Sequence, residues 1–193
     1  MPSIRLYIDV RRLCVLTCIA LCFGRPIVVA QVPMPEGLLP QFEAAGVELL
    51  FPVDAGYKWF ILDASVSQPC PYGMYSRQEH LEIRYLLEPY DTLLNPEADF
   101  PHFWAMRQVI NLASNDEEDL ITAHSLSDSM LSAFKADWGK LFFFHPKKSF
   151  SPRENCQFLA LFREGKGAVG LFFLFDEPTA VLEKRLYGVV YKD

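Results

Sequence analysis

Residues 157–176 read QFLALFREGKGAVGLFFLFD. Two strongly apolar runs flank a short polar tip with two glycines, a pattern typical of a β-hairpin. Leu159–Phe162 and Leu171–Phe175 are apolar at every position, which indicates strands that are covered on both faces. The segment therefore predicts a hairpin at the middle of a sheet, with helices packed over it.

The segments around this hairpin predict further strands and helices in separate blocks. Strands are expected at residues 47–52, 57–66, 80–88, 140–146 and 187–193, the first two joined as a hairpin. Helices are expected at residues 38–45, 101–113 and 178–186 and within 125–139, where Ser127 and Asp128 are candidate caps, and a loop is expected at 67–78. This order predicts an α+β fold: a central antiparallel sheet of about six to seven strands with helices packed on it, an α/β/α sandwich.

Two of these elements carry a clear side-chain pattern. Residues 80–88 alternate, so Glu82 and Arg84 are expected on a solvated face of a half-buried strand. The helix at 101–113 is expected to cover the sheet with a single apolar stripe, made of Phe103, Met106, Val109, Ile110 and Ala113.

The N-terminal segment has the features of a secretory signal. Three arginines precede an apolar run, Leu13–Gly24, that is too short for a membrane span, and Val28 and Ala30 form a small-residue cleavage site. We expect a signal peptide at 1–30, cleavage between Ala30 and Gln31, and a single α+β domain at 31–193, secreted or periplasmic and without a stable membrane span. A retained signal anchor is the alternative.

The charge of the chain restricts its partners. The whole chain has a formal net charge of −6. Without residues 1–30, which hold four arginines and one aspartate, 14 basic and 23 acidic side chains remain, a net charge of −9. Nucleic acid requires a basic footprint and is not expected as a partner.

Cys70 and Cys156 are the cysteines that remain after cleavage. In an oxidising compartment, two cysteines far apart in sequence are most simply one disulfide. Two separate buried thiols are the alternative. A nucleophilic role is not expected for Cys70, because it lies between two prolines and has no base beside it in the sequence.

Four stretches resemble small secreted bacterial proteins of the Mog1/PsbP-like kind. They are EAAGVELLFPVDAGYKW at 43–59, LEIRYLLEP at 81–89, FKADWGKLFFF at 134–144 and LFFLFDEP at 171–178. The resemblance implies a central antiparallel sheet covered by helices, and a binding or assembly role. It carries over no catalytic residues.

The candidate functional residues lie in the third of these stretches. Lys135, Asp137, Trp138 and Lys140 form a compact polar and aromatic group, in which Asp137 could orient a ligand and Trp138 could stack on it. The alternative is a turn at a helix exit with a core aromatic. His80, His102, His124 and His145 show no metal-ligand spacing, so no metal or cofactor is expected.

The sequence thus favours a non-enzymatic domain that binds a protein partner or assists assembly at the cell envelope. No nucleophile elbow or metalloprotease motif is present in it. The alternative is an envelope hydrolase, in which the fold would bring His102 or His145 against an acid such as Asp137.

Overall fold

The computed structural model describes residues 34–50, 52, 54–63, 69–90 and 101–193. These residues belong to one compact unit within Val32–Asp193. The expected signal peptide and its cleavage site between Ala30 and Gln31 lie outside the described residues. Within the described ranges, no helix is long and apolar enough to cross a membrane.

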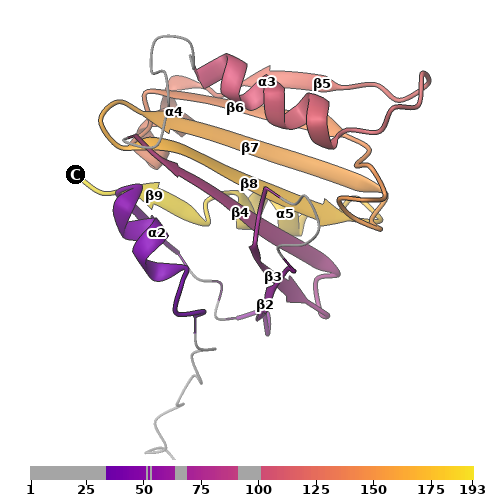
Figure 1. Cartoon of the computed structure of the whole chain (residues 1–193), viewed down its shortest axis with the longest axis horizontal. Helices are drawn as coiled ribbons and strands as arrows, with labels where there is room; N and C mark the ends of the chain where they lie inside the picture. The colour runs from indigo at the N-terminus through magenta and orange to yellow at the C-terminus, as the bar shows by residue number, and fades with distance from the viewer. Residues whose placement is uncertain (1–33, 51, 53, 64–68, 91–100) are drawn as a thin grey trace, which may run out of the picture. The chain divides into compact units, whose positions relative to one another are not determined.

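The predicted hairpin is present, formed by β7 (Asn155–Arg163) and β8 (Gly167–Phe175). It lies inside a seven-stranded antiparallel sheet with the order β2-β3-β4-β8-β7-β6-β5 (Figure 1). All nine residues of β8 are buried between β4 and β7. The predictions of a central hairpin and of an α+β fold with an antiparallel sheet are therefore confirmed.

The remaining strands of this sheet are β2 (Lys58–Ile61), β3 (Tyr72–Ser76), β4 (Leu81–Pro89), β5 (Thr122–Ser125) and β6 (Trp138–Phe144). A second, two-stranded sheet pairs β1 (Val47–Leu49) with β9 (Val189–Tyr191). The hairpin expected between residues 47–52 and 57–66 is therefore wrong, because β1 pairs with β9 and β2 pairs with β3. The loop expected at 67–78 contains β3.

Helices cover both faces of the seven-stranded sheet. One face packs against α2 (Leu39–Ala44), α4 (Asp128–Phe134) and α5 (Val181–Leu186), and Phe173 lies in that cluster. The other face packs against α3 (Pro101–Leu112), and Phe172 lies there. Figure 1 shows α3 in front of β6 and β7, with α5 behind the sheet. Neighbouring residues of β8 thus enter different cores, which explains the absence of polar alternation.

The alternation of residues 80–88 predicted Arg84 on a solvated face, and this prediction is wrong. The Arg84 side chain is 4% exposed, and its Nε donates to Glu82 Oε1 at 2.6 Å. Its Nη1 donates to the carbonyl oxygen of Phe150, whose ring lies beneath the guanidinium. The segment after β6 folds back over this face, and β4 lies inside the sheet between β3 and β8. Arg84 is therefore buried, and its partner Glu82 is 12% exposed at the margin of the core.

The predicted disulfide is absent. Cys70 and Cys156 are free thiols, both fully buried in the apolar cluster that also holds Trp104 and Phe158. Burial raises the pKa of each thiol above its ordinary value. Both cysteines therefore act as small apolar side chains in a closed core, which agrees with the alternative of two buried thiols.

Candidate functional site

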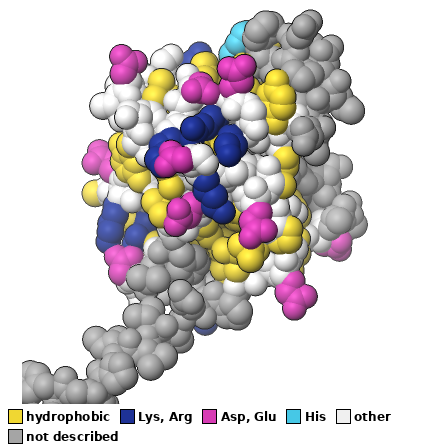
Figure 2. All heavy atoms as spheres, turned by 90° about the vertical axis from the view of Figure 1, so that its left-hand side faces the viewer, with side chains coloured by type: hydrophobic (Ala, Val, Ile, Leu, Met, Phe, Trp, Pro, Cys, Tyr) yellow, Lys and Arg dark blue, Asp and Glu magenta, His cyan; other side chains and the backbone are white. Residues whose placement is uncertain are grey.

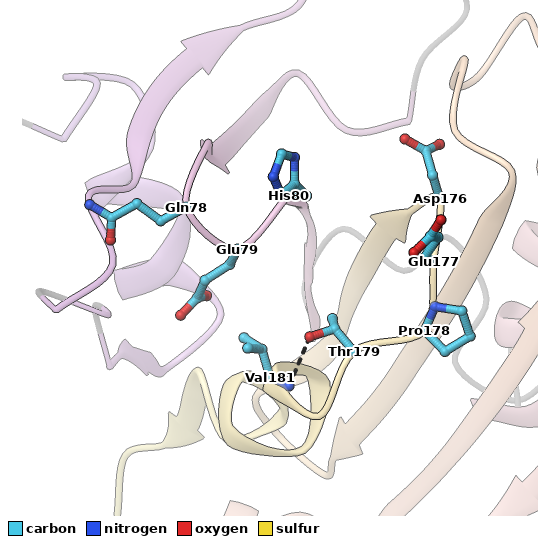
Figure 3. A pocket seen from close by; sticks show the side chains of 8 residues that line it. All are labelled: Gln78, Glu79, His80, Asp176, Glu177, Pro178, Thr179 and Val181. Atoms are coloured by element: carbon cyan, nitrogen blue, oxygen red, sulfur yellow. Dashed lines mark hydrogen bonds between the residues drawn. The ribbon is translucent and has the colours of Figure 1, made fainter.

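An open cleft of about 580 Å³ lies at the end of the sheet where β3 turns into β4 and β8 leads to α5. Figure 3 shows the two segments facing each other, with Gln78, Glu79 and His80 on one side and residues 176–179 on the other. The lining is polar and includes three carboxylates, those of Glu79, Asp176 and Glu177. A cleft with convergent polar groups is the usual first candidate for a binding site.

The carboxylate of Glu79 is engaged in an ion-pair network. Arg185, whose side chain is 6% exposed, donates to Glu79 at 2.9 and 2.5 Å and to Asp54 at 2.9 Å. The hydroxyl of Tyr57 donates to Glu79 at 2.6 Å. Burial alone would raise the pKa of Glu79, but the hydrogen bonds from Arg185 and Tyr57 outweigh it, so this pKa lies below its ordinary value. Glu79 therefore joins β3 to α5 and is poorly suited to proton transfer.

Asp176, on the opposite wall, is also engaged. Arg153 Nη1 donates to its carboxylate at 2.6 Å, and the side-chain amide of Asn155 donates to its backbone carbonyl at 2.7 Å. The hydrogen bond from Arg153 holds the pKa of Asp176 below its ordinary range. This carboxylate thus fixes the start of β7 against the end of β8.

The residues described contain no group of three or more His, Cys, Asp or Glu side chains that could hold a metal ion. His80, in the left-handed region at φ 50°, is exposed beside the cleft. Glu79 and Asp176 both accept hydrogen bonds from arginines, so neither carboxylate is available as a general acid or base. The cleft is therefore better suited to binding than to proton transfer.

The four residues selected from the sequence do not surround one cavity. Lys135, in the left-handed region after α4, pairs with Asp193 at 2.6 Å. Asp137 Oδ2 accepts the backbone N–H of Glu164 at the tip of the β7–β8 hairpin, at 2.8 Å. On the side seen in Figure 2, basic side chains gather around a carboxylate, and Figure 1 places the C-terminus and the hairpin tip on that side.

Trp138 and Lys140 lie further along, at alternate positions of β6. Trp138 is half-buried against the core beneath α3. Lys140 Nζ lies 5.9 Å from the centre of the Phe142 ring. The structure therefore gives Asp137 a role in the hairpin turn and Trp138 a role in packing, the alternative that the sequence had left open.

His145, one of the two histidines named for a hydrolase, does not meet Asp137. The acidic neighbour of His145 is Asp119, with 3.6 Å between Nδ1 and Oδ1, in an open surface cleft of about 400 Å³. This distance is too long for a hydrogen bond, and the imidazole is 55% exposed. Asp137 is bound to the hairpin tip instead.

Helix α3 carries an exposed apolar stripe that its sequence pattern did not reveal. Phe103 is 59%, Met106 is 38% and Ile110 is 62% exposed, although all three were expected in the core. Val109 and Ala113 of the expected stripe are buried, but the helix is turned so that a second set of residues packs on the sheet beside them: Trp104, Ala105, Gln108 and Leu112. This second set also has helical spacing and includes the largest side chain of the helix, a signal that could have identified the buried face.

The edge strand β5 is also exposed. All four of its residues are exposed, and it pairs with β6 on one side. Leu120 and Ile121, directly before it, are 78% and 44% exposed. Figure 1 draws α3 in front of the sheet at the end of the strand order where β5 lies, and α3 contacts β6 and β7.

Comparisons of the chain with protein-family models, with curated proteins and with solved structures give no match.

Proposed function

We propose that this chain is a non-enzymatic domain that binds a protein partner, or assists assembly, at the cell envelope. The observation that supports the proposal is the exposed stripe of Phe103, Met106 and Ile110 on α3. The envelope location rests on the expected signal peptide, and a binding or assembly role is what the resemblance to Mog1/PsbP-like proteins implies.

The three exposed apolar residues of α3 are neighbours on the helix surface, unlike the single exposed apolar side chains that are common on proteins. Phe103, Met106 and Ile110 are three and four positions apart, so they lie on one face of a single helix. The opposite face of α3 already packs on the sheet through Trp104 and Val109. Single exposed apolar residues are normal, whereas contiguous apolar patches mark interaction surfaces. A partner that buried this face would remove its three apolar side chains from water.

The experiment is a pull-down from envelope extract with the purified chain as bait. Phe103→Asp combined with Ile110→Asp should reduce the recovery of a specific partner about tenfold or more, because charges replace two apolar contacts. Asn111→Asp is the matched control, since it adds a charge on an exposed position of the same helical turn. Thermal melts would verify that all variants are folded.

Failure of the wild-type chain to recover a specific partner would contradict the proposal. Equal recovery with wild type, the double variant and the Asn111→Asp control would contradict binding at α3. The partner would then have to bind elsewhere on the molecule, for example at the cleft lined by Glu177.

A further inference from the structure

The outer edge of β5 presents backbone groups that are suited to pairing with another strand. The N–H of Leu126 donates to the carbonyl of Gly139 at 3.1 Å, which fixes the phase of the β5–β6 ladder. In an antiparallel pair, hydrogen-bonded positions alternate with positions whose N–H and C=O point away. Ala123 and Ser125 are at these outward positions, at the end of the sheet order.

This edge lacks the usual protection against pairing. Edge strands are commonly protected by charged residues, proline or bulges. Residues 120–126 read LITAHSL and contain neither a formal charge nor a proline, and Leu120 and Ile121 are exposed beside the strand. At the opposite edge of the sheet, β2 begins with the exposed Lys58.

A small groove adjoins the start of β5. Its volume is about 150 Å³, and apolar side chains from three strands contribute to its lining, which consists of Leu120, Thr122, Phe143, Phe144, His145, Asn155, Cys156 and Phe175. When a peptide adds to a sheet edge, backbone hydrogen bonds supply affinity and pockets for alternate side chains supply specificity. Most of this lining belongs to β6, β7 and β8, which lie inward of β5, so the outer edge of β5 is available for pairing through its backbone groups and not through this groove.

The charge near β5 indicates the chemistry of that strand. The acidic run at 116–119 directly precedes the exposed edge, and Asp116, Glu117 and Glu118 are themselves exposed. An antiparallel pairing of β5 with β5 of a second copy would bring this run against the other copy's Asp128. Like charges at such positions are destabilising. Asp116 and Asp119 line a cleft together with Lys147 and Lys148. Glu117 and Glu118 are outside that lining, and their charges disfavour self-pairing and favour a basic partner.

We propose that β5 binds an extended segment of a partner protein as an added antiparallel strand. The central residues of this partner segment are apolar, and its C-terminal end carries Lys or Arg. In the antiparallel arrangement, that C-terminal end faces residues 116–119. The inference rests on the proposed function, since the same partner would also cover α3.

The test measures binding of a synthetic fluorescent peptide, Thr-Val-Thr-Val-Thr-Lys-Lys amide, to the purified chain by anisotropy, together with NMR shifts at Ile121–Ser125. Ala123→Pro removes an outward N–H and leaves the β6 ladder intact, and it should weaken binding about tenfold or more. Ala123→Val keeps the N–H and should bind within about twofold of wild type. Glu117→Gln with Glu118→Gln should weaken binding about threefold and reduce its salt dependence.

A second measurement does not depend on the folding of any variant. The same peptide with N-methylated amides at alternate residues should not bind, and a peptide ending in two glutamates should bind more weakly. Equal binding of the methylated and unmethylated peptides would overturn the proposal. So would a wild-type dimer that Ala123→Pro converts to a monomer, because the edge would then belong to a second copy. If Phe103→Asp with Ile110→Asp abolishes partner recovery while Ala123→Pro does not, the proposed function stands and strand addition is wrong.

Discussion

Arg84 Nη1 donates a 2.7 Å hydrogen bond to the carbonyl oxygen of Phe150, and its guanidinium lies 4.7 Å from the centre of the ring of the same residue. Together with Glu82, this arrangement places an ion pair, with Arg84 buried and Glu82 at the margin of the core, between β4 and the segment that follows β6. Removal of one partner from a buried pair leaves an uncompensated charge.

Arg84→Ala should accordingly lower the free energy of unfolding by about 3–5 kcal/mol, the range for a broken buried pair. Lys148→Ala is the control, because the pair of Lys148 with Glu154 is more than half exposed. That loss should be within about 0.5 kcal/mol. Urea unfolding of both variants measures the difference. Similar small losses would mean that Arg84 is accessible to water.

Phe173 tests the central position of the hairpin. Its side chain is fully buried, and its strand neighbours are Ile83 and Gln157. Phe173→Ala should cost about 3–5 kcal/mol of unfolding free energy, which is typical of a large aromatic in a core. Glu164→Ala at the exposed hairpin tip should cost about 0.5 kcal/mol or less, since the backbone of Glu164, not its side chain, binds Asp137. Equal losses would place the hairpin at the surface.

Glu79 predicts a specific acid dependence of stability. Its pKa in the folded chain is lower than in the unfolded chain, so its stabilising contribution is present above the unfolded value and is lost as pH falls through the folded value. The difference in unfolding free energy between wild type and Glu79→Gln should therefore shrink from about pH 6 to about pH 3. Urea unfolding across this range measures the difference. A constant difference would mean that Glu79 is not paired with Arg185.

The two buried thiols predict slow chemistry in the folded state. Cys70 and Cys156 are inaccessible, and burial raises the pKa of both thiols, so the native chain should resist alkylation by iodoacetamide at neutral pH. Alkylation in urea without reductant should modify both residues, as peptide mass spectrometry would show. Recovery of a linked Cys70–Cys156 peptide would show that the two thiols form a disulfide and would contradict this prediction.

The central hairpin could be predicted because strands that are apolar at every position must be covered on both faces, which places them inside a sheet. The pairing of β1 with β9 could not, because the partners of Val47 and Leu49, Tyr191 and Val189, lie at the far end of the chain. Gly73 contributed to the prediction of a loop at residues 67–78, where the structure has β3. In the structure this glycine gives room to the ring of Phe60, which a Cβ at position 73 would approach to 2.4 Å.

The candidate site was less predictable for a related reason. Helix α3 has apolar residues on two faces, and the sequence periodicity alone does not state which face packs on the sheet. Asp137 and Trp138 resembled a ligand site because they are adjacent in sequence, but Asp137 binds the hairpin tip and Trp138 packs beneath α3. The contacts of these two residues depend on segments far away in the sequence, so local spacing could not predict them.

The most direct test of partner binding at α3 is photo-crosslinking in envelope extract, with p-benzoylphenylalanine in place of Met106 or, as a control, of the exposed Glu183 on α5. Partner binding at α3 predicts one discrete adduct at position 106, which Ile110→Asp in the same chain removes, and no such adduct at position 183. The same products at both positions, or an adduct at 106 that is unaffected by Ile110→Asp, would contradict it.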